Sequence, residues 1–541
     1  MQHEPICDLA SASESTTTDA TTDATTDATT DATTDATTTT GETSTSTSTS
    51  TSSDTTDTDT TDGLLCDDGI KSGDESDIDC GGSCPAKCAV GQLCAADPVN
   101  CQSNVCNGVY CVELAACTLP PFTDLLPGTP NDQLGRNVTV VGDVNGDGID
   151  DLAVSATTMS DPRVFVVFGG ADLNLDVLDA IDNDVPGPGF LIHLITSTAA
   201  IAGVGDINED GFDDILIGEE ILDIANVVFG KADAAAVDVG IIGDKGVVLD
   251  CVTNGNGLGS AVAGGADING DGVADFAVSR PFDNLVAVVY GGASLPNCFE
   301  AADVGETIDG YRIAGPAESA AGASLITVPD LNGDGKDELA LTSHNGFTLT
   351  IYVHYGRDQA GFFDLQDAEP MDGFTVVADS DLGGALLGSA GDVNGDGTPD
   401  IIIGVGTAVY VLFMDAFQAP IDLALLGANG FRVDALTVVT AVSGAGDVNG
   451  DGLADLAIGT DMTSSVLIVL GKADPDPVAF NDLQSDQGGF ILESSAIGDS
   501  FGASLDHGQL YGPSIPTLAI GAPDWSTEGA ATIVIPGICP N

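Results

Sequence analysis

The sequence predicts an all-β fold, a β-propeller assembled from repeated four-stranded units. An acidic loop of pattern DxNxDGxx(D/E) recurs six times between residues 143 and 455. A short apolar run follows each loop and a second run comes soon after, as in DLAVS and RVFVVFGG of the first copy. A third strand signature of the type GFxI lies between units, as in GFLI and GFRV. Such a unit cannot bury its apolar face alone, so neighbouring units must stack.

The spacing of the repeats favours blades arranged around an axis. Successive loops are separated by 63, 61, 63, 62 and 55 residues. The apolar runs alternate or are continuous over four to eight residues, which indicates short strands, and no helical period is present. Four short strands per unit are typical of propeller blades.

A seventh unit begins at Phe501, where FGASLDHGQLYGPSIPTLAIGAPDW keeps the strand motif LAIG but lacks the acidic loop. We therefore predict seven blades, six of them with the loop. Only six GFxI signatures serve these seven units, so closure of the ring needs a strand from elsewhere, and the segment from Val112 to Pro127 is the expected donor.

The cysteine count indicates an oxidising compartment. Eight of the 13 cysteines are crowded into one segment, which favours disulfides and export. Because ring closure would bring both ends of the repeat region together, we predict a bridge between Cys117 and Cys539, and a second between Cys251 and Cys298. Cys7 is left over.

Three regions are predicted. Residues 1–63 are rich in Thr, Ser and Asp, with five copies of TTDA, and are expected to form a disordered, extended stalk. Residues 64–117 form a cysteine-rich disulfide module, and residues 118–541 form the propeller. The eight cysteines of the module are Cys66, Cys80, Cys84, Cys88, Cys94, Cys101, Cys106 and Cys111.

A zinc site is the alternative interpretation of the module. Its CxxxC spacings lack the paired CxxC knuckles and nearby histidines of zinc sites, so four disulfides are favoured. The stretch DGIKSGDESDIDCGGSCPAKC resembles short cysteine-rich modules found beside surface domains in secreted proteins of myxobacteria and related bacteria. That resemblance implies location rather than activity.

Charge restricts the classes of partner. The formal net charge is −72, from 84 acidic and 12 basic residues, which repels nucleic acid and anionic lipid. Clustered carboxylates favour divalent cations as partners instead.

Location is expected to be extracellular or at a bacterial cell surface. The opening residues, MQHEPICDLA, show no basic and apolar signal-peptide pattern, so no signal peptide is visible at this start. No apolar stretch is long enough to span a bilayer, and lipidation of Cys7 would provide an N-terminal tether.

The acidic loop is predicted to bind calcium, giving about six ions per chain. Calcium takes six to eight oxygen ligands, and alternate residues of such a loop point inward, whereas magnesium prefers to keep several waters. The expected ligands stand at positions one, three, five and nine by side chain and at position seven by backbone carbonyl. In the first three loops they are Asp143, Asn145, Asp147, Ile149, Asp151; Asp206, Asn208, Asp210, Phe212, Asp214; and Asp267, Asn269, Asp271, Val273, Asp275. In the last three they are Asp330, Asn332, Asp334, Lys336, Glu338; Asp392, Asn394, Asp396, Thr398, Asp400; and Asp447, Asn449, Asp451, Leu453, Asp455.

Glycine at position six is expected to adopt positive φ in a sharp turn, as at Gly148. An EF-hand is excluded because position twelve is apolar, as at Val154, and strands rather than helices follow. The alternative that the loops are only polar hairpin turns does not explain five matched positions recurring six times.

These loops, each followed by a DLxxG strand, resemble the FG-GAP repeat of the seven-bladed propeller in integrin α-subunits, over residues 131–537. Glycines eight residues before the first Asp match the FG half at Gly135, Gly259, Gly322 and Gly384, while Thr198 and Val439 depart from it. The GAP half is intact at Gly521-Ala522-Pro523. The resemblance implies calcium loops on one face of the disc and partners on the opposite face or rim.

The expected function is a calcium-stabilised, exported scaffold for adhesion or ligand binding, with an unknown protein or glycan as partner. The alternative is a secreted hydrolase or lyase with its site in the propeller channel. The chain has no GxSxG or HExxH motif and no zinc spacing among His3, His193, His344, His354 and His507. His344 and His354 are the candidate catalytic pair for that alternative, and no catalytic residue is assigned.

Overall fold

The structure, a computed structural model, describes most of the chain after residue 121. The described residues are 122–125, 133–156, 161–170, 177–182, 187–196, 200–250, 257–292, 295–345, 348–379, 384–414, 420–461, 465–484, 488–494, 500–512, 516–524 and 530–534. The predicted stalk, the cysteine-rich module, Cys7, Cys117, Cys251 and Cys539 lie outside them. Cys298 is disulfide-bonded, and its predicted pairing with Cys251 stays a prediction.

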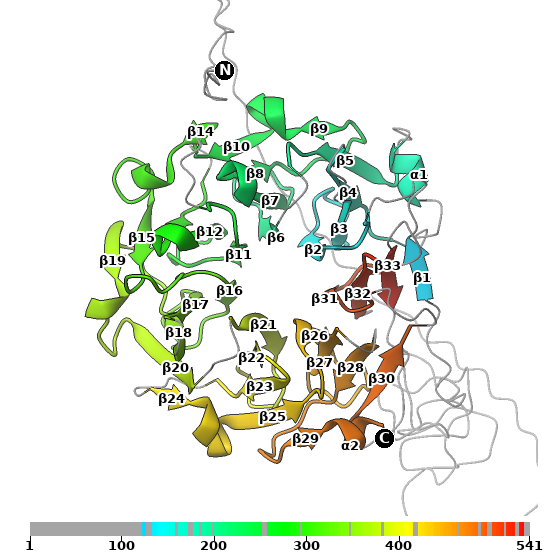
Figure 1. The fold of residues 1–541 in the computed structure, drawn as a ribbon. Coiled ribbons are helices and arrows are strands. Elements are labelled where there is room, and N and C mark those ends of the chain that lie inside the picture. The colour runs from blue at the N-terminus through cyan, green and yellow to red at the C-terminus, as the bar shows by residue number, and fades with distance from the viewer. Residues whose placement is uncertain are drawn as a thin grey trace, which may run out of the picture.

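Seven sheets surround a central axis (Figure 1). In order from the axis outward, blade 1 consists of β2 (Val138–Gly142), β3 (Asp151–Ala156), β4 (Arg163–Val167), β5 (Gly189–His193) and β9 (Val237–Asp238). Blade 2 consists of β6 (Ala200–Gly205), β7 (Asp214–Glu219), β8 (Ile224–Val228), β10 (Gly246–Leu249) and β14 (Cys298–Phe299). Blade 3 consists of β11 (Val262–Ala266), β12 (Asp275–Arg280), β13 (Leu285–Val289), β15 (Gly310–Ala314) and β19 (Gly361–Asp364).

The remaining sheets follow the same order. Blade 4 consists of β16 (Leu325–Val328), β17 (Glu338–His344), β18 (Thr348–His354), β20 (Gly373–Asp379) and β24 (Ile421–Asp422). Blade 5 consists of β21 (Leu386–Gly391), β22 (Asp400–Val405), β23 (Ala408–Leu412), β25 (Gly430–Asp434) and β29 (Val478–Ala479). Blade 6 consists of β26 (Val439–Gly446), β27 (Asp455–Thr460), β28 (Ser465–Val469) and β30 (Gly489–Glu493). The seventh sheet consists of β31 (Ser504–Gly508), β32 (Thr517–Ala522), β33 (Ala530–Val534) and β1 (Phe122–Leu125).

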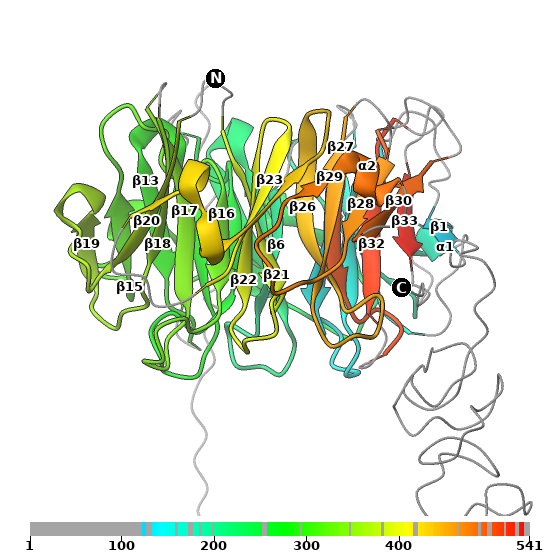
Figure 2. The same cartoon turned by 90° about the horizontal axis from the view of Figure 1, so that it is seen from below.

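The prediction of an all-β propeller is confirmed, and β1 lies within the expected closing segment. It pairs antiparallel with β33, with Phe122 opposite Val534. The disc is seen edge-on in Figure 2, with the strands running between its two faces. No helix among the described residues is long and apolar enough to cross a membrane.

The four-strand count was incomplete for five of the blades. Each of these five has a fifth, outermost strand of two to four residues that pairs parallel with the fourth strand. Two short helices, α1 (Val177–Asp182) and α2 (Phe480–Leu483), were also not expected. A strand of two residues is too short to produce a recognisable apolar period.

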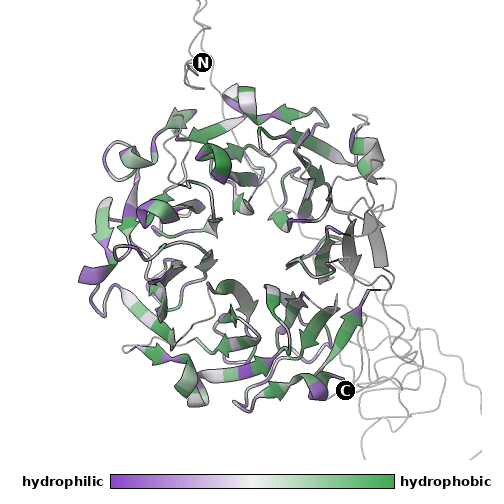
Figure 3. Ribbon diagram, viewed as in Figure 1, coloured by the Kyte–Doolittle hydropathy of each residue, from purple (hydrophilic) through white to green (hydrophobic). Residues whose placement is uncertain are grey.

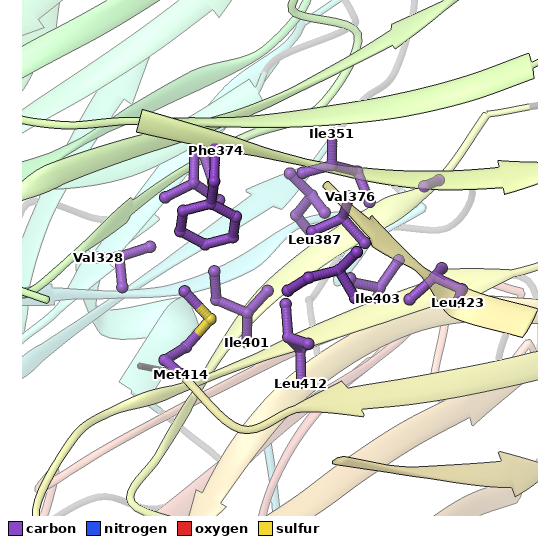
Figure 4. Packing of buried hydrophobic residues seen from close by; sticks show 14 of the residues in the cluster. Val328, Ile351, Phe374, Val376, Leu387, Ile401, Ile403, Leu412, Met414 and Leu423 are labelled. Atoms are coloured by element: carbon purple, nitrogen blue, oxygen red, sulfur yellow. The ribbon is translucent and has the colours of Figure 1, made fainter. Parts of the chain in front are cut away.

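Apolar side chains between neighbouring blades hold the ring together. Between blades 4 and 5, Phe374 and Val376 pack in one cluster with Leu387, Ile401 and Ile403 (Figure 4). Burying an aliphatic or aromatic side chain of this size contributes about 1.5–3 kcal/mol. Hydropathy colouring shows the apolar residues along the strands and polar residues mainly in outer loops (Figure 3).

Paired glycines allow neighbouring blades to approach backbone to backbone. A Cβ added to Gly218 at the end of β7 would lie 2.1 Å from the carbonyl oxygen of Gly259, which precedes the next blade. The same contact joins Gly459 to Gly502 at 2.0 Å and Gly521 to Gly135 at 1.9 Å. At these three boundaries the two glycines therefore meet across the boundary between blades, because any side chain there would displace a carbonyl group.

Candidate metal-binding loops

Six acidic loops connect the first strand of a blade to its second. In four of them the first strand ends in a β-bulge with a glycine at positive φ immediately before the loop. These glycines are Gly142, Gly205, Gly391 and Gly446, with φ of 79°, 67°, 74° and 69°. A bulge with a left-handed glycine turns the strand sharply, so the first Asp begins the loop directly.

The first loop is folded around its own carboxylates. The Asp143 carboxylate accepts hydrogen bonds from the backbone N–H groups of Asp147 at 2.9 Å and Gly148 at 2.7 Å. Oδ1 of Asp147 accepts the N–H of Ile149 at 3.0 Å. Gly148 has φ of 87°, so the predicted positive φ at position six is confirmed, and the same holds for Gly211, Gly272, Gly335, Gly397 and Gly452.

The last acidic residue of each loop is buried. Asp151 is 0% exposed, and its Oδ1 accepts the N–H of Gly169 at 2.7 Å, just beyond β4. Its Oδ2 is buried and has no hydrogen-bond partner among the described residues. Burial, joined by repulsion from Asp147 and Asp143, raises the pKa of Asp151 to about 8, although the hydrogen bond from the Gly169 N–H acts to lower it.

The five other closing carboxylates share this environment. Burial raises the pKa of Asp214 and Glu338 to about 8 and that of Asp275, Asp400 and Asp455 to about 7. All five are 0% exposed. An ionised carboxylate in such a place is costly unless a cation or hydrogen-bond donors compensate its charge.

Hydrogen bonds also bring the predicted asparagine ligands close to the carboxylates. Asn145 Nδ2 lies 3.2 Å from Asp151 Oδ1, and Asn332 Nδ2 lies 3.2 Å from Glu338 Oε1. In three other loops the asparagine amide donates to the Asp at position five, in the pairs Asn269–Asp271, Asn394–Asp396 and Asn449–Asp451. In these five loops the asparagine at position three thus lies within hydrogen-bond distance of the acid at position five or nine.

The donor chemistry fits calcium, although a finished metal cluster is not formed. Each loop offers carboxylate, amide and backbone oxygens, which are the ligands that calcium takes in proteins. Among the described residues, no group of three or more His, Cys, Asp or Glu side chains is arranged to hold a metal ion. In this conformation the carboxylates accept N–H groups of their own loop. The metal assignment of the individual residues stays a prediction.

Contacts between neighbouring loops were not predicted from the sequence. Asp213, at position eight of the second loop, accepts the N–H of Asp143 at 2.8 Å, and Asp337 accepts the N–H of Asp267 at 2.9 Å. Position eight is also acidic at Asp150, whose carboxylate accepts the N–H of Gln509 from the seventh sheet at 2.8 Å. Acidic residues at this position were the available signal.

Residues at position seven, predicted to act through their carbonyl groups, place their side chains on the preceding loop. A Cβ added to Gly146 would lie 2.9 Å from Phe212, and one added to Gly270 would lie 3.0 Å from Lys336. These contacts and the Asp213 bond show that the loops are neighbours on one face of the disc.

The two histidines of the catalytic alternative, His344 and His354, lie apart in blade 4. His344 pairs with Leu349 and His354 with Leu339, so the two histidines stand at opposite ends of the β17–β18 hairpin. A different contact joins the inner strands β26 and β31, where Ser443 Oγ lies 3.2 Å from His507 Nδ1. The Asp506 carboxylate is also nearest to Nδ1, at 4.0 Å, whereas a hydrolase triad uses opposite ring nitrogens.

Two stretches of the chain, residues 134–159 and 438–469, match the model of the FG-GAP repeat. Each includes a first strand, an acidic loop and the strand that follows. The chain carries FG-GAP repeats. Its relatives include "Integrin alpha pat-2" of Caenorhabditis briggsae, 26% identical over 265 residues, and the protein of the same name from Caenorhabditis elegans, 25% identical over 244 residues.

The relationship to integrin α-subunits is distant and partial. The matches cover 41% and 40% of this chain, and 20% and 19% of the two relatives. This FG-GAP chain therefore spans about a fifth of the length of the relatives it matches. Among solved structures, two crystals of BBS1N in complex with ARL6DN, soaked with mercury or lead, give TM-scores of 0.41 and 0.43 at 9% identity. They cover 78% and 77% of this chain and 98% and 97% of the others, and carry no argument about function.

Proposed function

We propose that this protein is an exported FG-GAP propeller that binds a protein or glycan ligand at a cell surface, with about six calcium ions in a structural role. The proposal includes the seventh sheet as a complete blade that closes the ring, and disulfides in the cysteine-rich region. The distant relationship to integrin α-subunits supports an adhesion or ligand-binding role.

The observation that carries the binding role is the difference between the two faces. One face carries the acidic loops. The turns between second and third strands lie at the opposite face, where two of them expose a large apolar side chain, Ile221 at 65% and Phe282 at 68%. Leu436, on the connection from β25 to β26, is 65% exposed at that face as well. Loops held by a rigid scaffold commonly carry binding residues, and exposed apolar side chains that gather on one face favour a binding surface there.

Calcium is assigned a structural role because the predicted ligands also tie strands together. Asp151 fixes the end of β4 through Gly169, so a cation that compensates its charge also stabilises the blade. Six calcium ions per chain are expected by native mass spectrometry or elemental analysis. A chelator should lower the melting temperature by more than ten degrees, as roughly one to two kcal/mol per site is lost. Two or fewer bound ions, or an unchanged melt, would contradict this role.

Ligand binding is tested on immobilised glycans and on surface extracts with calcium present or chelated. The single variants Ile221→Asp and Phe282→Asp should weaken capture at least tenfold without changing the calcium count. The matched control is Ile241→Asp, since Ile241 is 74% exposed but lies between the third and fourth strands of blade 2. Equal loss in the control would show that the apolar face is not the ligand surface.

A further inference from the structure

The fifth strands of blades 1 to 5 follow one rule of pairing. Each runs parallel to the fourth strand and places one residue opposite the fourth residue of that strand. The pairs are Ile192–Val237, Leu249–Phe299, Ile313–Phe363, Val376–Ile421 and Val433–Val478. The common register indicates that the fifth strand is a repeated part of the unit, supplied in each case by the following blade.

The fifth strands also share a residue pattern. The paired residue is apolar, and an acidic residue follows it in four of the five, as in Val237-Asp238 and Ile421-Asp422. The side chains of Asp238 and Asp422 each accept an N–H two residues later at 2.9 Å, which starts a short 3₁₀ turn. The residue after the acid is apolar and buried at Val239, Ala301, Leu365 and Leu423.

Distance along the chain is equally regular. The paired apolar residue stands nine to eleven residues before the first residue of the next blade's fourth strand, as from Val237 to Gly246 and from Ile421 to Gly430. The fourth strands begin with glycine followed by an aromatic residue in most blades, as at Gly430-Phe431.

Blade 6 departs from the rule. Within the described part of the chain, β30 pairs only with β28, so its outer edge has no strand beside it. An unpaired strand edge presents N–H and C=O groups that favour a further strand. The next sheet takes its fourth strand, β1, from the N-terminal side of the chain, and β1 lies next to β30 on the rim (Figure 1).

The residues before β1 repeat the pattern at the expected distance. The sequence reads Val112-Glu113-Leu114, an apolar residue, an acid and an apolar residue, and Val112 stands nine residues before Pro121-Phe122. We propose that residues 112–113 bind the outer edge of β30 as the fifth strand of blade 6. This inference concerns attachment of the N-terminal region and does not depend on the proposed ligand or on calcium.

The pairing in blade 2 defines the hydrogen bonds of this proposal. There the N–H groups of Val248 and Asp250 donate to the carbonyl oxygens of Asn297 and Phe299, at 2.9 and 3.0 Å. The same register places Val112 opposite Leu492. The N–H groups of Ile491 and Glu493 then donate to the carbonyl oxygens of Tyr110 and Val112.

The outward direction of these two N–H groups follows from the bond on the other side of the strand. The N–H of Leu470, the residue directly after β28, donates to the carbonyl oxygen of Gly488, directly before β30, at 3.0 Å. Antiparallel pairs alternate, so Phe490 and Leu492 exchange hydrogen bonds with β28, and Ile491 and Glu493 face outward. Blade 2 also has two acids directly after this register, because Asp250 follows Leu249 and Glu300 follows Phe299, and Arg280 lies 3.6 Å from Asp250.

This attachment fixes the position of the cysteine-rich region. Cys111, its last cysteine, directly precedes Val112, so the region would leave the disc at the rim of blade 6, beside the closing strand. Two adjacent rim strands, residues 112–113 and β1, then hold the N-terminal region to the propeller.

Hydrogen–deuterium exchange resolved to single amides tests the proposal in the full-length protein. In the wild-type protein, the Ile491 and Glu493 amides should exchange at least tenfold more slowly than unpaired amides. The conservative control Val112→Ile should leave the exchange rates of these two amides unchanged. Val112→Pro removes the backbone N–H of residue 112 and disfavours the strand formed by residues 112–113. In this variant the Ile491 and Glu493 amides should exchange at least tenfold faster than in the wild-type protein, while the Phe490 and Leu492 amides stay protected.

The exchange rates of the wild-type protein test the proposal even if Val112→Pro fails to fold. Rapid exchange of Ile491 and Glu493 in the wild-type protein, with Phe490 and Leu492 protected, would overturn the proposal. Protection that survives in folded Val112→Pro would also overturn it, because another segment would then cover β30.

Discussion

Asp151 illustrates how one residue serves both the strand hairpin and the predicted cation. Its Oδ1 binds the Gly169 N–H, while its Oδ2 is buried and unpaired among the described residues. The sequence predicted its position in the loop, because alternate polar residues form a recognisable pattern. It did not predict the bond to Gly169, since that partner lies 18 residues later and the contact depends on tertiary packing.

The pH dependence of the metal-free protein follows from these carboxylates. Their folded-state pKa values are raised to about 7 or 8, above the ordinary value of 3.8 for Asp. Their contribution to stability is therefore complete below about pH 4 and is lost as the pH rises towards 8. In chelator, the melting temperature should fall between pH 5 and pH 8. With excess calcium the fall should be smaller, because calcium binds the ionised form. A metal-free melt that rises over this range would contradict the assignment.

Replacing one closing carboxylate by its amide separates its two roles. Asp151→Asn keeps an oxygen for the Gly169 N–H but removes the buried charge. We expect a higher melting temperature in chelator at pH 8 and one calcium ion fewer per chain. The matched control, Asp244→Asn, changes an exposed acid in blade 2 and should alter neither quantity. An unchanged calcium count in Asp151→Asn would remove this residue from the ligand set.

At the scale of elements, the strands were predictable from apolar runs and the blade contacts were not. DLAVS and RVFVV became β3 and β4 because each is long enough to show a strand pattern. The two-residue strands β9 and β24 lie below that length, so only the structure reveals their register. The contact between Gly218 and Gly259 was also not predicted, because a glycine in a sequence does not indicate which residues it contacts in the fold.

Glycine contacts between blades give a matched pair of substitutions. Gly218→Ala places a Cβ 2.1 Å from the Gly259 carbonyl oxygen and should destabilise the protein by about 1–3 kcal/mol or more, as overpacked sites do. Gly384→Ala meets no atom within 4 Å and should be nearly neutral. Both are measured by chemical denaturation with excess calcium. Equal stability of the two variants would show that the blades separate easily at this contact.

For the whole molecule, the ring was predictable from repeat number and the way it closes was predictable in part. Six loops and a seventh LAIG strand required a ring, and a missing GFxI signature required a donor strand, which is β1. The unpaired edge of β30 could not be foreseen, because it depends on which strands lie next to each other.

Net charge sets the expected response of the whole molecule to salt. With a net charge of −72, the acidic groups repel one another. Salt weakens this repulsion, because at about 0.15 M ionic strength charges farther apart than roughly 8 Å are largely screened. Sodium chloride should therefore raise the melting temperature of the chelator-treated protein, and sucrose at equal osmolality serves as the uncharged control. The rise should be smaller with calcium bound. A melting temperature that falls with salt would show that attractive ion pairs dominate.

The pairing of β1 with β33 has a consequence for biosynthesis. Strand β1 is translated hundreds of residues before its partner β33, so it remains without that partner while six other sheets are synthesised. Intermediate blades can stack as they emerge, because each needs only its neighbour. The ring itself closes only after residues 530–534 have been synthesised, so β1 stays without its partner strand until the seventh sheet is made.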